Sequence, residues 1–241
     1  MANRVETPEE VERTSALGFT LFQGAFFAKP NLVRQRRVGT GGIASLRTLA
    51  AVAAPDASFE DLEQAISKDV GLSLKLLRYV NSAFFSLPRT VGSVHEALTL
   101  LGMATVRRWA TVMALVEATA DAPEELVELA LQRARMCEVL GGNPDPEHAD
   151  ALFTVGLFSV ADALLDVPME EVLETLPFSD EIRAALLRHE GTKGELLERV
   201  MEYERGEFPS EARRGGLTLT DAYSDAVPWA GEARRASAPG S

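Results

Sequence analysis

The sequence predicts an all-α helical bundle preceded by a short α/β segment. From Ile43 onward, apolar residues recur at the three- and four-residue spacing of amphipathic helices almost without interruption. No alternating strand pattern appears after residue 41, whereas residues 19–30, "FTLFQGAFFAKP", form an aromatic-rich run that predicts a short buried strand. With 241 residues, of which 46% are hydrophobic, the chain can bury one good core.

The first thirty residues are expected to hold one helix between short strands. In "TPEEVERTSALG", Thr7 is the predicted N-cap, Pro8 takes the first helical position, and Gly18 ends the helix. The aromatic run follows directly and ends at Pro30. Because one helix and two short strands cannot form an independent sheet domain, residues 1–30 are expected to pack on the helical block or to pair with a second chain.

A basic connector at residues 31–41 leads into the helical block. The helix that starts at the Ser58 cap is expected to end near Gly71, and the next helix is expected to bury Leu74. The apolar patterns predict helices at residues 43–54, 58–71, 72–85, 93–102, 104–120, 123–141, 146–165, 168–176, 179–191 and 193–206.

A last helix is expected to start at a Thr218 or Thr220 cap and to close at Pro228. The final residues are small and polar, which is typical of a disordered tail. The predicted domains are therefore an N-terminal segment (1–30), a linker (31–41), a helical domain (41–205), a C-terminal helical extension (206–232) and a disordered tail (233–241).

The net charge of −12 disfavours binding to nucleic-acid phosphates. One basic patch, "LVRQRRVG", contains Arg34, Arg36 and Arg37, but no aromatic residues for base stacking alternate with them. We interpret the patch as a solvated linker or an intramolecular docking strip, with anion binding as the alternative. No nucleic-acid partner is expected.

No run approaches the about 20 apolar residues that a membrane helix needs, and "MANRVETPEE" lacks the pattern of a secretory signal. A cytoplasmic protein with no membrane partner is therefore expected. The single cysteine, Cys137, excludes an internal disulfide and a multi-cysteine zinc site, and its apolar flanks predict a core thiol.

Three local signatures, in order, resemble the HDOD family, the HD-related output domains of bacterial signalling proteins. They are "DLEQAISKDVGLSLKLLRYVNSAFF", "VGSVHEALTLLGMATVRRW" and "HADALFTVGLFSVADALL". The last resembles the helix that carries Gly-Leu-Leu-His-Asp in catalytic HD relatives. The resemblance covers roughly residues 41–205 and implies an HDOD-type helical bundle that serves as a non-catalytic output or scaffold module.

The N-terminal segment resembles the end of an EAL domain, the barrel that hydrolyses cyclic di-GMP. "ANRVET" and "FQGAFFAKP" carry this resemblance, although Asn3 and Ala25 depart from the family pattern. The Glu-Ala-Leu motif and nearly all of the metal ligands of that family are not in the chain. The order of segments looks like the C-terminal portion of YuxH-type EAL-HDOD signalling proteins.

No catalytic residue, metal or cofactor is expected in the helical block. Ser159 and Val160 stand at the degenerate positions, where the resembled catalytic relatives carry a metal-binding His-Asp pair, and valine cannot bind a metal. We interpret His148 as part of a helix N-terminus and His189 as a helix C-terminal residue, while His95 is expected at the surface.

The preferred function is therefore a non-catalytic module of cyclic di-GMP signalling that binds a signalling protein. One alternative is a nucleotide-sensing domain that binds a ligand, such as cyclic di-GMP, without hydrolysis, although this binding is not expected. A more distant alternative is a residual metal-dependent phosphohydrolase. A homodimer through residues 1–30 is also predicted. The predicted interaction surface is Asn81, Ser82, Phe85, Leu87 and Arg89, although the phenylalanines of this loop could instead fill the core.

Overall fold

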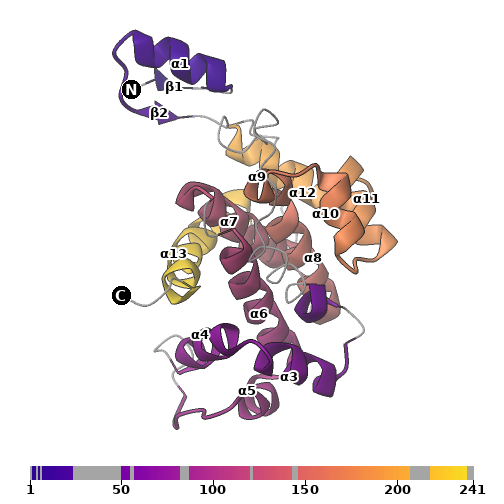
Figure 1. The fold of residues 1–241 in the computed structure, drawn as a ribbon. Coiled ribbons are helices and arrows are strands. Elements are labelled where there is room, and N and C mark those ends of the chain that lie inside the picture. The colour runs from indigo at the N-terminus through magenta and orange to yellow at the C-terminus, as the bar shows by residue number, and fades with distance from the viewer. Residues whose placement is uncertain are drawn as a thin grey trace.

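The computed structural model describes residues 2–3, 5, 7–23, 50–54, 57–81, 87–119, 122–142, 146–206 and 218–237. Within these residues, a body of packed helices follows a small β-α-β unit, and Figure 1 draws this unit apart from the body. The predicted all-α body is confirmed. The assignment of the N-terminal unit to the end of an EAL barrel stays a prediction.

In the N-terminal unit, strand β1 (Ala2–Asn3) pairs in parallel with strand β2 (Phe22–Gln23), and helix α1 (Pro8–Ala16) connects them. α1 begins where predicted, because the Thr7 hydroxyl accepts a hydrogen bond from a first-turn amide at 3.3 Å. It ends before Gly18, whose φ of 87° is a conformation that glycine adopts readily. Local capping signals were enough to predict this helix.

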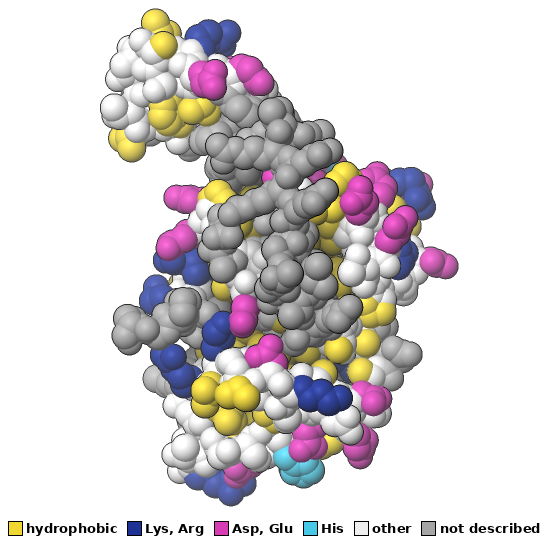
Figure 2. Space-filling view, viewed as in Figure 1, with side chains coloured by type: hydrophobic (Ala, Val, Ile, Leu, Met, Phe, Trp, Pro, Cys, Tyr) yellow, Lys and Arg dark blue, Asp and Glu magenta, His cyan; other side chains and the backbone are white. Residues whose placement is uncertain are grey.

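The apolar run after α1 is largely exposed. Leu17, Phe19 and Leu21 are 72%, 39% and 65% exposed, and Figure 2 shows hydrophobic side chains at the surface of this unit. The prediction of a buried strand is wrong for Phe19 and Leu21, and the helical block does not cover them. The physical reason is that two parallel strands of two residues each leave open edges and uncovered faces.

The helical body runs from α3 to α13, and every helix predicted between residues 58 and 206 has a counterpart in it. No helix among the described residues combines the length and apolar character needed to cross a membrane. The helices are α3 (Phe59–Ser67), α4 (Val70–Val80), α5 (Val94–Leu101), α6 (Met103–Ala118), α7 (Glu124–Gly141), α8 (Pro146–Phe158), α9 (Ala161–Leu165), α10 (Met169–Thr175), α11 (Asp180–Arg188), α12 (Gly191–Glu204) and α13 (Leu219–Ser237).

The boundary between α3 and α4 differs from the prediction. The Asp69 carboxylate accepts a hydrogen bond from the Leu72 amide at 3.0 Å and so caps α4, which places Gly71 inside α4 rather than at the end of α3. This register turns Leu72 and Leu76 into the core. The predicted burial of Leu74 is wrong, because its side chain lies on the opposite face and is 58% exposed.

Helix α7 lies at the centre of the body and packs against α8, α12 and α13. α7 and α8 touch through their backbones at Gly156, where an added Cβ would lie 2.5 Å from the Arg133 carbonyl oxygen and 2.6 Å from the Ala134 Cα. Cys137 of α7 is fully buried, and burial raises the pKa of its thiol to about 12. The prediction of a core thiol is confirmed.

Helix α13 extends past its predicted limits. It continues through Pro228 to Ser237, so the predicted closure at Pro228 and the predicted disordered tail from residue 233 are both wrong at these positions. Ala230 and Ala233, which follow the proline, are fully buried. Packing against α7 therefore maintains a helix that the proline would otherwise interrupt.

Candidate functional site

Ser159 and Val160, the degenerate positions, lie in a turn between α8 and α9. The prediction of one continuous helix over residues 146–165 is wrong at this point. The Ser159 hydroxyl donates a hydrogen bond to the Gly156 carbonyl at 2.7 Å, and Val160 is buried with 2% of its surface exposed. The hydroxyl thus satisfies a carbonyl at the helix end, where the regular backbone hydrogen bonds stop.

A buried arginine of α7 reaches this turn. Arg133 is 6% exposed, and its Nη1 donates a hydrogen bond to the Ser159 Oγ at 3.2 Å. On its other side, Nε and Nη2 of the same guanidinium lie 2.8 Å and 2.7 Å from Oε2 of Glu204 on α12. Charge-assisted contacts of this kind are among the stronger hydrogen bonds in proteins. The guanidinium therefore ties the α8–α9 turn and α12 to the central helix.

One carboxylate, that of Asp162, follows the turn in α9. Burial raises the pKa of the Asp162 carboxyl, while a hydrogen bond from the Ala163 amide at 2.8 Å and the nearby Arg133 charge act in the opposite direction. The polar groups around the turn are thus a hydroxyl, a guanidinium and two carboxyls, and one of these, Glu204, is paired with the guanidinium. A divalent cation prefers several neutral imidazole or carboxylate ligands.

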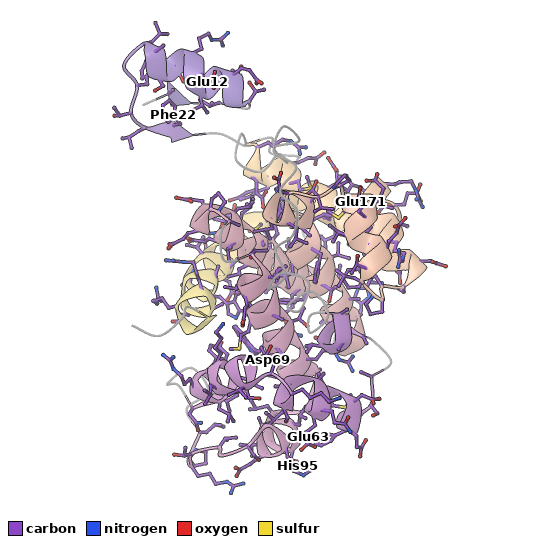
Figure 3. All side chains as sticks on the ribbon, in the orientation of Figure 1. Glu12, Phe22, Glu63, Asp69, His95 and Glu171 are labelled. Atoms are coloured by element: carbon purple, nitrogen blue, oxygen red, sulfur yellow. The ribbon has the colours of Figure 1, made fainter. Side chains whose placement is uncertain are left out.

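The three histidines lie on different elements. His95 of α5 is within 3.0 Å of Glu63 on α3, and Figure 3 shows these two side chains together near the surface. His189 ends α11 with a φ of 52° and its Nδ1 contacts the Glu198 carboxylate, while His148 is half-buried in the first turn of α8. Among the residues that the structure describes, no three His, Cys, Asp or Glu side chains gather as a metal site requires.

The predicted interaction surface is described only in part. The Asn81 side-chain amide donates to the carbonyls of Leu77 and Val91, at 2.8 and 2.9 Å, and its oxygen accepts from the Val91 amide at 2.7 Å. Asn81 thus fastens the end of α4 to Val91, three residues before the start of α5. Leu87 is half-buried against the core, whereas the exposed Arg89 forms an ion pair with Glu96 at 3.0 Å.

Five other predicted residues lie outside the described part of the chain. Their predicted roles, in the interaction surface and in the basic strip, stay predictions. They are Ser82, Phe85, Arg34, Arg36 and Arg37.

The arginines inside the body were not predicted from the sequence. Arg133 lies three residues after Ala130 and four before Cys137, on the face of α7 that its apolar residues predict to be buried. A basic residue on such a face signals a buried ion pair, but its partner cannot be read from spacing. A second arginine, Arg108 of α6, joins Glu138 of α7 and Asp150 of α8.

A model of the HDOD domain family matches residues 44–211. The chain is 34% identical over 209 residues to a protein of Vibrio cholerae named cyclic di-GMP phosphodiesterase CdgJ, and the match covers 86% of this chain and 48% of that protein. It is 27% identical over 236 residues to the uncharacterized protein YuxH of Bacillus subtilis, and this match covers 95% of this chain and 58% of that protein. The chain thus spans about half the length of these relatives.

Two crystal structures have a similar fold. A putative phosphohydrolase from Shewanella amazonensis matches with a TM-score of 0.53 and 15% identity, over 88% of this chain and 97% of that one. A putative signal transduction protein from Marinobacter aquaeolei matches with a TM-score of 0.53 and 16% identity, over 95% and 72%. At these identities the likeness concerns the fold alone.

Proposed function

Because the chain belongs to the HDOD domain family, we propose that it is a non-catalytic output module of bacterial cyclic di-GMP signalling, which acts by binding a signalling protein. The observation that carries this proposal is the Arg133–Glu204 ion pair beside Ser159. The catalytic HD relatives that the sequence resembles carry a metal-binding His-Asp pair at the matching positions. Here these positions hold Ser159 and Val160, beside a guanidinium that is already paired with Glu204.

The electrostatics of the turn support the absence of catalysis. The Arg133 guanidinium holds Glu204 in an ion pair, so that carboxylate already has a cationic partner, and a guanidinium itself donates hydrogen bonds but offers no lone pair to a metal. Its neighbour Ser159 offers only a weak neutral ligand, and Val160 offers none. Metal-assisted hydrolysis needs a bound ion that activates a water molecule, and the described residues around this turn favour packing instead.

The link to cyclic di-GMP is drawn from the relatives. The Vibrio cholerae protein is named a cyclic di-GMP phosphodiesterase, and this chain matches 48% of it. We propose that the matched region contributes signalling output rather than hydrolysis. Leu87 and the exposed Arg89 belong to the surface that we propose for the partner, because Asn81 holds the ends of their segment in place.

The catalytic part of the proposal is tested by incubating the purified chain with cyclic di-GMP and Mg²⁺ or Mn²⁺, with product analysis by chromatography. We expect no hydrolysis above a protein-free control. Turnover that increases with protein concentration and stops on addition of EDTA would contradict the proposal. Calorimetric titration with the same nucleotide distinguishes a protein-binding module from the alternative, a nucleotide-sensing domain. Saturable binding without turnover would favour the nucleotide sensor.

A further inference from the structure

Helix α13 covers a surface of the body that is built from aromatic and charged side chains. The helix-docking surface consists of Tyr79, Trp109, Arg135 and Phe153, from α4, α6, α7 and α8. The centroid of the Trp229 ring of α13 lies 5.3 Å from that of the Trp109 ring and 5.8 Å from that of the Phe153 ring. The Arg135 Cζ lies 5.9 Å from the Trp229 ring centroid. Trp109 in turn contacts Tyr79, with ring centroids 3.8 Å apart. The one tryptophan of α13 therefore packs on a cluster of aromatic rings of the body.

The rest of the α13 interface buries little side-chain surface. Within residues 218–235, the fully buried side chains are alanines at positions 222, 226, 230 and 233, each with 0% exposure, and Trp229 is half-buried. An alanine removes one methyl group from water, far less than the leucines and phenylalanines that fill the core. In this helix of 19 residues, the side chains that α13 buries completely are therefore small ones, with Leu219 and Trp229 partly buried against the core.

Two ion pairs set the direction in which α13 docks. Arg135 Nε donates to Asp225 at 2.6 Å, and Arg234 near the end of α13 donates to Glu124 at 2.5 Å. The Asp225 and Glu124 side chains are 47% and 78% exposed, so these pairs add specificity more than stability. The surface thus fits a helix that carries an acid in its first half and a base near its C-terminus.

Helix α13 also caps its own N-terminus. The Thr218 hydroxyl accepts from the Asp221 amide at 3.1 Å, and the Asp221 carboxylate accepts from the Thr218 amide at 3.1 Å. This reciprocal pair is a capping box, which stabilises a helix without help from the body. The hydrogen bonds that stabilise its first turn therefore involve no residue of the body.

From these contacts we infer that α13 is a displaceable helix that shields a docking surface for a helix of a partner protein. The partner helix has the same pattern as α13: small residues at three- and four-residue spacing, one aromatic side chain between them, and acidic-to-basic polarity along its length. This recognition mode places an amphipathic helix in an apolar surface. The inference deepens the proposed interaction function and rests on it.

Hydrogen exchange on the full chain tests the displacement directly. We expect the α13 amides to exchange at least tenfold faster than the α7 amides, through an opening of α13 alone that depends less on denaturant than global unfolding does. Equal protection of α13 and α7, with the same denaturant dependence, would overturn the inference. Hydrogen exchange measures only the opening of α13, so a negative result would not affect the proposed lack of hydrolysis. In the same way, turnover in the hydrolysis assay would contradict the proposed function without changing the exchange result.

A peptide competition tests the docking surface. The substitution Ala226→Glu places a charge on the buried alanine face and releases α13, whereas Ser224→Glu on the exposed face is the matched control. A fluorescent peptide of residues 218–237 is expected to bind the Ala226→Glu chain at least tenfold more tightly than the wild type or the control. A peptide that itself carries Ala226→Glu should not bind.

Two results of the competition would contradict the inference. One is equal binding of the peptide to all three chains, or binding to none of them. The other is loss of the whole helical fold in the Ala226→Glu chain by circular dichroism, because a displaceable helix leaves the body folded when it detaches.

Discussion

Arg133 shows how a single buried charge can determine the packing around it. Its guanidinium is shared between a hydroxyl of the α8–α9 turn and a carboxylate of α12, so that one side chain of the central helix contacts two other parts of the body. The Glu204 side chain is 16% exposed and is paired with this guanidinium. A buried carboxylate without a partner is costly, whereas an apolar pair of similar volume is tolerated.

We predict that Arg133→Met lowers the free energy of unfolding by about 3–5 kcal/mol, because Glu204 stays buried without its partner. The double variant Arg133→Met/Glu204→Leu should recover much of this loss. Urea denaturation measures the free energy of unfolding of the single and the double variant. Arg188→Met, which breaks the exposed pair with Glu190, is the control and should leave stability nearly unchanged. If the double variant were as unstable as the single one, the loss would come from packing and not from the unpaired charge.

A second residue prediction concerns pH. Burial raises the pKa of Asp162 in the folded state above its ordinary value of 3.8, so the ionised carboxyl disfavours folding at neutral pH. As the pH falls through the folded and then the unfolded pKa, both states become neutral and this penalty disappears. Asp162→Asn should therefore raise the melting temperature at pH 7 and lose this advantage below pH 3.8. An advantage that is independent of pH would contradict the electrostatic cause.

At the scale of elements, the contact between α7 and α8 depends on the missing side chain of Gly156. An added Cβ would meet three backbone atoms of α7, and backbone cannot move aside as a flexible side chain can. The turn that follows this helix and the arginine that reaches it depend on the same close approach. Position 156 is thus important for packing although it carries no functional group.

We predict that Gly156→Ala lowers the free energy of unfolding by about 1–3 kcal/mol, because α7 and α8 must separate. Gly71→Ala in α4 is the matched control: its added Cβ would meet only the Asp69 carboxylate, at 3.4 Å. The control should be neutral or stabilising, since alanine favours helix more than glycine does. Thermal unfolding of both variants measures the difference in stability. Equal changes in the two variants would show that the close approach of α7 and α8 does not determine the effect at position 156.

At the scale of the whole molecule, the sequence predicts features that depend on local hydrogen bonds better than features that depend on contacts between distant residues. The caps at Thr7 and Ser58 are local hydrogen bonds, and both helices begin where these residues predict. The Arg133–Glu204 pair joins residues 71 positions apart, so no spacing rule could predict it. The break after Phe158 also depends on packing, because the sequence around it continues a helical apolar pattern.

The exposed apolar residues of the N-terminal unit motivate a prediction about assembly. If residues 1–30 mediate a homodimer, Leu21→Glu should convert a concentration-dependent dimer to a monomer, because Leu21 is 65% exposed beside β2. Leu187→Glu on α11, at a leucine that is 38% exposed, is the control and should leave the dimer intact. Analytical ultracentrifugation measures both, and a wild-type chain that stays monomeric at all concentrations would contradict this assembly.

The stacked rings beneath α13 give the molecule an intrinsic optical signal. The chain has two tryptophans, Trp109 and Trp229, and they contact each other across the α13 interface. Their emission therefore reports on one place in the fold, free from contributions by tryptophans elsewhere. Docking and release of the C-terminal helix can be followed in real time, in unlabelled protein, by the intensity and wavelength of ordinary fluorescence.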